Sequence, residues 1–221
     1  MLRCHIHKME QGDFTLQNIN LEVGHNQHVC LMGKTGCGKT SLVEVICGLR
    51  QLKAGSIFLN EIDVTHTPPA QRGIGYVPQD CALFPHMTVR DHMHFPLKLH
   101  HWTQNNRQER VAYLLEALGI ESIAKRKPHH LSGGEMKRVA LGRALSFKPH
   151  FLCLDEPLSA LDDATCQEIY QLLKFIKSEF QVSILHITHQ QAEVNELADK
   201  VYVLEQKSRQ AGAQLRLWPK V

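Results

Sequence analysis

The sequence lacks the features that would place it inside a membrane or on a secretory route. No apolar run approaches the roughly 20 residues that a membrane-spanning helix needs, and the start, Met1 to His5, lacks the apolar core of a signal peptide. The seven cysteines include no C-x-x-C pair, which disfavours a disulfide framework or a zinc site of the usual spacing. We therefore expect a cytosolic protein with reduced thiols.

Clustered basic charge is missing as well. The net charge is only +3 with histidine neutral, and no stripe of Lys and Arg with interleaved aromatic residues occurs, so nucleic acid is not an expected partner. Internal repeats and low-complexity segments are also absent. With 43% hydrophobic residues in 221, the chain is large enough for a globular unit with its own core.

Histidine, by contrast, is abundant, with 15 residues. Neighbouring histidines occur at His92 and His94, His100 and His101, and His129 and His130. Residues one or two positions apart do not share a helix face. We therefore expect surface or packing roles for these neighbours, and no metal site.

A phosphate-binding loop is the first motif that carries chemistry. The run Gly33-Lys34-Thr35-Gly36-Cys37-Gly38-Lys39-Thr40, followed by Ser41, fits G-x-x-x-x-G-K-[ST]. In this pattern backbone N–H groups cradle phosphates, Lys39 reaches the β and γ phosphates, and Thr40 can hold Mg²⁺. The apolar run from Gln27 to Met32 predicts a strand before the loop, and Lys39 to Gly48 has helical spacing after it. A plain glycine-rich turn would not need this setting, so we predict nucleotide binding.

Cys37 lies within this loop, where N–H groups and Lys39 make the surroundings electropositive. Such surroundings lower a thiol pKa and favour the thiolate. We therefore predict that a maleimide inactivates the protein and that a bound nucleotide protects it.

Two further elements have the residue types of a phosphate site. Leu131-Ser132-Gly133-Gly134-Glu135 precedes a helical run, which places Ser132, Gly133 and Gly134 at a helix N-terminus, a setting that binds anions. Phe151 to Leu154 is an apolar strand that ends in Asp155 and Glu156. We predict that Asp155 supports Mg²⁺ and that Glu156 polarises an attacking water. A solvated acidic turn would not explain the four apolar residues in front.

The order of the expected elements indicates the fold class. Alternation predicts antiparallel strands over Leu2 to His7 and Phe14 to Val23, a helical region over Thr88 to Ser146, and alternating strands and helices from Phe151 to Leu204. This is an α/β fold: a P-loop NTPase core with a mainly parallel sheet, an antiparallel β subdomain and a helical subdomain at about 80–146. Residues 1–205 are expected to form a single domain, and 206–221 a tail without clear structure.

Taken together, the motifs resemble the ATP-binding subunits of ABC transporters, over nearly the whole chain from Leu2 to Leu204. In family order, Tyr76-Val77-Pro78-Gln79-Asp80 resembles the glutamine loop, Ser159-Ala160-Leu161-Asp162 the aspartate loop and Ile187-Thr188-His189 the switch histidine. The resemblance implies that Gln79 contacts Mg²⁺ or the attacking water, that His189 holds the γ-phosphate and that Asp162 acts across a dimer. Glu156, His189 and Gln79 are then the expected catalytic residues.

Three positions qualify the resemblance. Phe14 resembles the aromatic residue that stacks on adenine, although a core position in an antiparallel strand explains it equally well. Lys34 stands where relatives commonly carry proline, and Glu135 where glutamine is commoner. Neither change removes a backbone N–H or the Ser132 hydroxyl, so ATP binding is still expected.

The resemblance also implies cofactors and partners. These are ATP and Mg²⁺, a second copy of the chain in a head-to-tail homodimer, integral membrane permease subunits and, indirectly, a solute-binding protein. The protein would then be peripheral, on the cytoplasmic face of the inner membrane. Ala82 to Val89 resembles the corresponding segment of importers, and the motif pattern favours an oxyanion such as molybdate or tungstate. Two alternatives stay open: a soluble ABC ATPase not coupled to transport, and a small-molecule P-loop kinase, which would not need Leu131 to Glu135.

Overall fold

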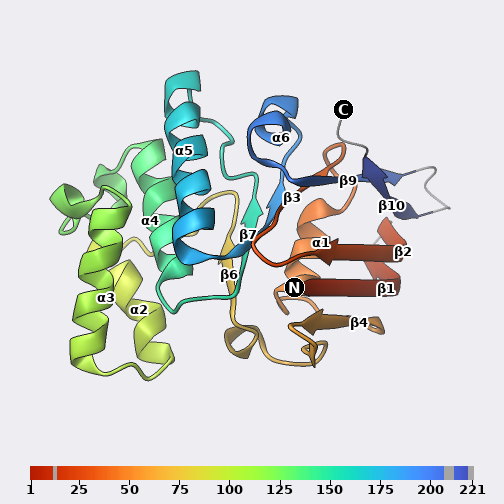
Figure 1. The fold of residues 1–221 in the computed structure, drawn as a ribbon, viewed down its shortest axis with the longest axis horizontal. Helices are drawn as coiled ribbons and strands as arrows, with labels where there is room; N and C mark the ends of the chain where they lie inside the picture. The colour runs from red at the N-terminus through yellow and green to blue at the C-terminus, as the bar shows by residue number, and fades with distance from the viewer. Residues whose placement is uncertain (12–13, 207–211, 219–221) are drawn as a thin grey trace.

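The chain forms one mixed sheet with helices on both faces (Figure 1). The structure, a computed structural model, describes residues 1–11, 14–206 and 212–218. Its strands are β1 (Leu2–Gln11), β2 (Phe14–Val23), β3 (His28–Met32), β4 (Ala54–Leu59), β5 (Ile62–Asp63), β6 (Ile74–Val77), β7 (Phe151–Asp155), β8 (Ser183–Ile187), β9 (Lys200–Gln206) and β10 (Ala213–Trp218). Its α-helices are α1 (Lys39–Ile46), α2 (Val89–Leu99), α3 (Gln104–Ala117), α4 (Gly133–Leu145), α5 (Asp163–Phe180) and α6 (Gln191–Leu197). Short 3₁₀ helices cover Pro69–Gln71, Glu121–Ile123 and Pro128–His130.

The ten strands lie in the order β5-β4-β1-β2-β10-β9-β3-β8-β7-β6. The half from β9 to β6 is parallel, and β1, β2, β4 and β5 pair antiparallel. Figure 1 shows the antiparallel strands at one end of the molecule and α2 to α4 at the other. The predicted α/β class, with a mainly parallel sheet, an antiparallel part and a helical part, is confirmed.

The register of the parallel strands brings three motifs to one edge of the sheet. Ile187 of β8 lies opposite both Leu31 of β3 and Asp155 of β7. The strands therefore end at the same level, and the segments that follow them meet at the carboxyl edge, where α/β sheets bind ligands.

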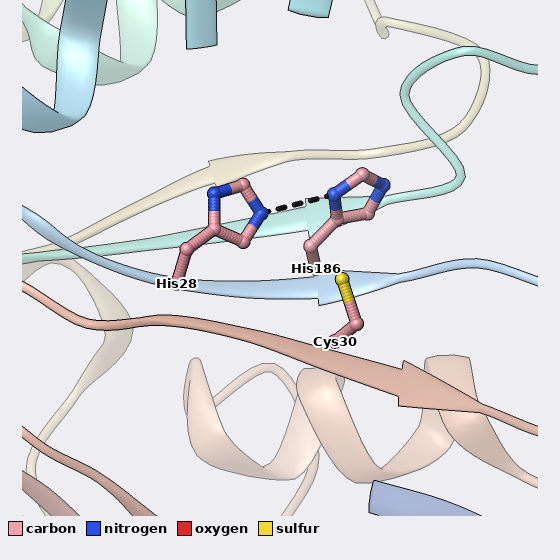
Figure 2. A group of neighbouring side chains, drawn as sticks. All are labelled: His28, Cys30 and His186. Atoms are coloured by element: carbon pink, nitrogen blue, oxygen red, sulfur yellow. Dashed lines mark hydrogen bonds between the residues drawn. The ribbon is translucent and has the colours of Figure 1, made fainter. Parts of the chain in front are cut away.

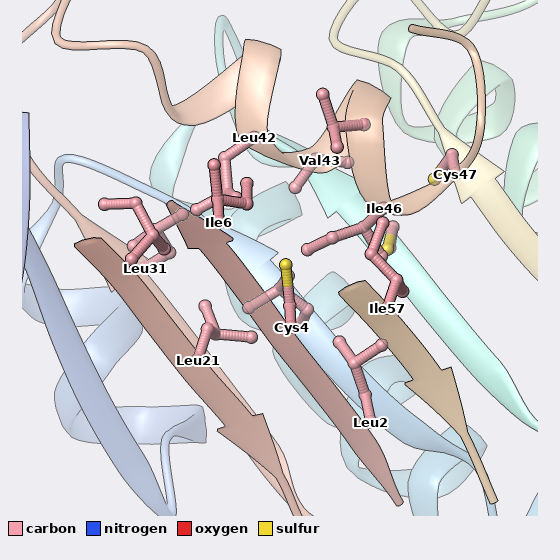
Figure 3. Packing of buried hydrophobic residues seen from close by; sticks show 14 of the residues in the cluster. Leu2, Cys4, Ile6, Leu21, Leu31, Leu42, Val43, Ile46, Cys47 and Ile57 are labelled. Atoms are coloured by element: carbon pink, nitrogen blue, oxygen red, sulfur yellow. The ribbon is translucent and has the colours of Figure 1, made fainter. Parts of the chain in front are cut away.

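Helix α1 is held between the two halves of the sheet. Its apolar side chains recur at helical spacing, and Leu42, Val43 and Ile46 are fully buried. They pack against both β1 and β3 in one core cluster, whose labelled members in Figure 3 are Leu2, Cys4, Ile6, Leu21, Leu31, Leu42, Val43, Ile46, Cys47 and Ile57. Each fully buried Leu or Ile contributes about 1.5–3 kcal/mol. The loop that precedes α1 is therefore anchored at both ends, by β3 and α1, to a well-packed core.

A second core cluster joins α2, α3, α4 and α5 to the opposite face of β7 and β8. Helix α2 begins at a capping box, in which the Asp91 N–H donates to Thr88 Oγ1 over 3.2 Å and the Thr88 N–H donates to Asp91 Oδ2 over 3.1 Å. This arrangement satisfies donors that a helix N-terminus leaves free.

Arg72 closes the C-terminal end of α1. The guanidinium is buried and donates to the main-chain oxygens of Val45 and Ile46, at 3.0 and 2.8 Å, and to those of Thr65 and Thr67, at 2.9 and 2.8 Å. The carbonyls at the end of a helix have no partner within it. Arg72 therefore gives the Ile46 carbonyl a donor, adds one to the backbone donors of the Val45 carbonyl, and ties α1 to the loop before β6.

The prediction of a tail without clear structure over 206–221 is wrong for residues 213–218. This segment forms β10, which pairs antiparallel with β9 over six residues and parallel with β2 at Ala213 and Leu16. Residues 207–211 and 219–221 lie outside the described part. Within the described ranges, no helix has the length and apolar character needed to cross a bilayer.

Candidate functional site

The glycine-rich loop from Gly33 to Gly38 joins β3 to α1, as its sequence predicts. Gly36 and Gly38 take φ values of 81° and 97°, in the left-handed region that favours glycine. Gly38 is the N-cap of α1 and offers no side-chain cap, so the first N–H groups of the helix stay available for an anion. Lys39 is buried, and its Nζ donates to the Gly33 and Lys34 main-chain oxygens over 2.8 and 3.1 Å.

The loop borders a cavity of about 490 Å³. The residues that line it are Thr35, Gly36, Gly38, Lys39, Thr40, Ser41, Gln79 and Glu156. Three separate motifs of the sequence, the glycine-rich loop, the glutamine loop and the carboxylate pair, thus share one cavity at the carboxyl edge of the sheet.

Asp155, at the end of β7, is linked to this cavity through Thr40, one of the lining residues. It is 3% exposed, and the Thr40 hydroxyl forms a hydrogen bond with it. Burial is the main reason that the pKa of this carboxyl is raised; Thr40 and Lys39 oppose the rise and Glu156 adds to it. A buried carboxylate and a hydroxyl side by side are hard oxygen donors of the kind that Mg²⁺ prefers.

Glu156 connects two of the sequence-predicted residues. Gln79 Nε2 donates to its Oε2 over 3.3 Å, and His189 Nδ1 lies 3.4 Å from its Oε1. Its backbone has φ 45°, an uncommon value for a residue with a side chain, and its N–H donates to the Ile187 main-chain oxygen. Sparsely populated conformations of this kind concentrate at functional sites.

Ser132 caps α4 but does not line the cavity. Its Oγ accepts from the Glu135 N–H over 3.2 Å, and the Glu135 carboxylate accepts from the Ser132 N–H over 2.6 Å. Ser132 and Gly133 are exposed, so within one chain this second anion site faces solvent. Asp162 similarly caps α5, where its carboxylate accepts from Thr165, and this bond lowers the pKa of the carboxyl.

Two predicted residues need separate mention. Phe14 begins β2, and its side chain lies outside the described part, so adenine stacking stays a prediction. The lowered pKa expected for Cys37 is wrong: burial raises the pKa of this thiol, and Lys39 only partly offsets the effect. The side chain belongs to the core cluster under α1, is 5% exposed and does not line the cavity that Thr40 and Glu156 border.

Sequence reasoning missed two cations that hold the glutamine loop. Lys137 Nζ donates to the Gln79 main-chain oxygen over 2.8 Å, and Arg143 donates to that of Cys81 over 2.8 Å. Both come from α4, the helix that Ser132 caps. The second anion site and the glutamine loop are thus parts of one hydrogen-bonded unit.

Comparisons with known proteins agree on one family. The family described as ABC transporter matches residues 16–159. The molybdate/tungstate import ATP-binding protein WtpC of Archaeoglobus fulgidus is 45% identical over 193 residues, which are 87% of this chain and 79% of that protein. WtpC of Pyrococcus abyssi is 41% identical over 204 residues, 92% of this chain and 59% of that protein. The chain thus spans about three fifths of the length of the second relative.

A solved structure has the same fold over nearly its whole length. The dimeric ATP-binding cassette MJ0796, in a post-hydrolysis state bound to ADP and Pi, superposes with a TM-score of 0.80 at 26% identity, covering 93% of this chain and 94% of the other. The family match spans well over half of the chain, and the Archaeoglobus relative is covered by more than two thirds. The chain therefore belongs to the ABC transporter family, as an ATP-binding domain.

Proposed function

We propose that this chain binds and hydrolyses ATP to drive solute import by an ABC transporter. The observation that carries the proposal is the cavity in which Lys39, Thr40, Gln79 and Glu156 meet at the carboxyl edge of the parallel sheet. It combines a helix N-terminus for phosphate, a buried cation for charge, and a carboxylate held by two polar neighbours.

Each group has a distinct proposed role. The phosphates of ATP would be held by the backbone N–H groups of residues 33–41, which include Lys34, Thr35 and Cys37. The Lys39 ammonium would hold them as well. Glu156 would accept a proton from the attacking water, because Gln79 and His189 hold its two oxygens in place. His189, whose side chain is 51% exposed, would turn from Glu156 toward the γ-phosphate when ATP is bound.

The residues present fit a magnesium ion. Thr40 and Asp155 are hydrogen-bonded to each other. Burial raises the pKa of the Asp155 carboxyl, and a nearby dication would lower that pKa again. Gln79 adds a third oxygen donor from the cavity wall. When bound, Mg²⁺ would neutralise the charge of the phosphates during transfer.

We propose further that two copies pair head to tail. The Ser132 hydroxyl, with Gly133 and Gly134 at the N-terminus of α4, is exposed and lies apart from its own chain's cavity, so a second copy can present it to ATP. Asp162 would lie at the same interface. The dimeric state of the MJ0796 cassette supports this arrangement. A self-complementary interface of this kind closes with two-fold symmetry.

The proposed partners are permease subunits in the membrane, with the chain peripheral on their cytoplasmic side. The solute that we favour is molybdate or tungstate, because several relatives that the chain resembles are named for the import of those oxyanions. Within this proposal the chain acts as one ATPase domain with a helical lobe at about 80–146, and β10 extends that domain beyond residue 205.

The test separates binding from hydrolysis. Glu156→Gln should keep ATP binding, lower turnover by about 100- to 10,000-fold, and accumulate dimer in size-exclusion chromatography with ATP and Mg²⁺. Lys39→Ala should weaken ATP binding itself. Glu109→Gln, at an exposed position on α3, is the matched control and should behave like the parent.

Two results would overturn the assignment. One is parent-like hydrolysis by Glu156→Gln. The other is a Glu156→Gln protein that binds ATP but whose copies do not pair, either in isolation or in the presence of the permease.

A further inference from the structure

Three metal-ligating side chains lie together in the core, away from the nucleotide cavity. His28 and Cys30 come from β3 and His186 from β8, and each is at most 1% exposed. One ligand atom from each lies within 4.8 Å of the other two, and His28 Nε2 is 3.1 Å from His186 Nδ1. Figure 2 shows the two rings edge to edge, with the Cys30 sulfur directed toward them. The group results from strand pairing, because Cys30 lies opposite His186 in the register.

A carboxylate stands behind one of the rings. Glu193 of α6 is 2% exposed, and its Oε2 lies 2.8 Å from His186 Nε2. The two atoms are not well aligned for a hydrogen bond, and neither has another hydrogen-bond partner among the described residues. A carboxylate at Nε2 favours the tautomer with the proton on that nitrogen, which leaves the Nδ1 lone pair facing His28 and Cys30. Histidines that bind metals usually have this carboxylate partner on the other nitrogen.

The charges also suit a dication. A Cys30 thiolate and the Glu193 carboxylate would together balance two positive charges. A buried site of zero net charge avoids the large cost of an unpaired buried ion.

We propose that His28, Cys30 and His186 form a binding site for a late first-row transition-metal dication of the Zn²⁺ class, with Glu193 as the outer carboxylate. Tetrahedral Zn²⁺ places two nitrogen ligands about 3.3 Å apart and a nitrogen and a sulfur about 3.6 Å apart. The distance of 3.1 Å between His28 Nε2 and His186 Nδ1 is close to the first value, and the ligand atoms of all three residues lie within 4.8 Å of one another. Imidazole with thiolate selects such metals over Mg²⁺. Three protein ligands leave the fourth position to a solvent molecule.

The site lies where a bound metal would stiffen the nucleotide-binding frame. Cys30 is followed within three residues by the phosphate loop at Gly33, and His186 within three residues by His189. Val194 of α6 packs over Cys30, so the short helix covers the site and must lift for the metal to enter. Binding would release the Cys30 thiol proton to solvent. The bound metal would also link β3 to β8. This link does not depend on the proposed hydrolysis of ATP.

The experiment is a titration of the full chain with Co²⁺, a spectroscopic substitute for Zn²⁺, in excess Mg²⁺ to occupy oxygen-rich sites. Tetrahedral Co²⁺ with a thiolate ligand gives strong visible bands and a near-ultraviolet charge-transfer band, whereas octahedral Co²⁺ gives weak bands only. We expect one tetrahedral Co²⁺ per chain, its displacement by Zn²⁺, and a higher unfolding temperature with Zn²⁺.

Variants assign the ligands. His186→Gln and Cys30→Ser should each abolish the charge-transfer band, and Glu193→Gln should keep the band with about 10- to 100-fold weaker affinity. The controls are Cys166→Ser, at the one cysteine that is not buried, and the double variant His129→Ala with His130→Ala, at exposed neighbouring histidines; both should bind as the parent does. Circular dichroism checks folding, and if Cys30→Ser does not fold, His186→Gln and Glu193→Gln decide.

Three results would overturn the proposal: no tetrahedral spectrum in the parent, bands that survive His186→Gln, or bands that disappear in either control. The group would then be a hydrogen-bonded pair of core histidines beside a buried thiol.

Discussion

Replacing Lys137 by methionine should slow ATP turnover while leaving ATP binding intact. Lys137 is 6% exposed and donates to the Gln79 main-chain oxygen over 2.8 Å. The Gln79 side chain in turn donates to Glu156 over 3.3 Å. The ammonium group therefore fixes the backbone from which a proposed catalytic contact is made. Methionine keeps an apolar stem of similar length and removes only the charged donor.

The expected size follows from that one bond. A hydrogen bond from a charged donor contributes about 1.5–3 kcal/mol. If all of it holds Gln79 in place, turnover should fall by about 10- to 150-fold, since about 1.4 kcal/mol corresponds to a factor of ten in rate. Lys137 does not line the cavity, so the dissociation constant for ATP should change by less than about threefold, or about 0.6 kcal/mol.

Phosphate release measures turnover, and a fluorescent ATP analogue measures binding. Lys137→Arg, which restores a charged donor, should recover part of the rate, and Lys125→Met, at an exposed lysine, should match the parent. Parent-like turnover in a folded Lys137→Met protein would refute the reasoning. A proportional loss of turnover and binding would show instead that the substitution disturbs the whole cavity.

Three further predictions concern other parts of the chain. Maleimide should modify Cys37 slowly near neutral pH and about tenfold faster per pH unit up to about pH 9, because burial raises the pKa of the thiol and the thiolate reacts; a rate independent of pH, or equal labelling of Cys37→Ala, would contradict this. Arg72→Met should lower the free energy of unfolding in urea by about 3–5 kcal/mol, because four carbonyls lose a charged donor, whereas a change below about 1 kcal/mol would mean that water replaces it. Phe84→Ser should keep ATP binding and weaken co-purification with a permease, since the ring is 39% exposed; failure to fold would place Phe84 in the core.

The parts of the site that follow strands were predictable from local sequence. The loop from Gly33 to Thr40 carries its own pattern, and Asp155 and Glu156 follow an apolar run that predicts a buried strand. Because parallel strands end at one edge, the sequence order alone placed these residues together. The structure adds their contacts, such as Gln79 and His189 on the two oxygens of Glu156.

Contacts between distant residues were not predictable. Lys137 binds a main-chain oxygen 58 positions away, and a backbone carbonyl has no sequence signature. His28 and His186 are 158 positions apart and belong to no motif, and only the register of β3 and β8 brings them together. For Cys37, the loop's positive field was evident from sequence, but the direction of the side chain into the core was not.

The strand β10 was missed although Ala213 to Leu217 alternates apolar and polar residues, which is a signal for a strand. Its burial does not follow this alternation: Ala213 is buried, the next residues are partly buried, and the last three are exposed. Backbone pairing with β9 over six residues holds the strand in the sheet.

The position of β10 determines where the chain can be truncated. In the sheet order, β10 stands between β2 and β9 and is the only described strand that connects the antiparallel half to the parallel half. A truncation after residue 206 would remove the strand that pairs with both β2 and β9, and would leave the edges of these two strands unpaired. Open edges recruit strands from other molecules, so such a fragment should aggregate even though every nucleotide-binding motif remains in it.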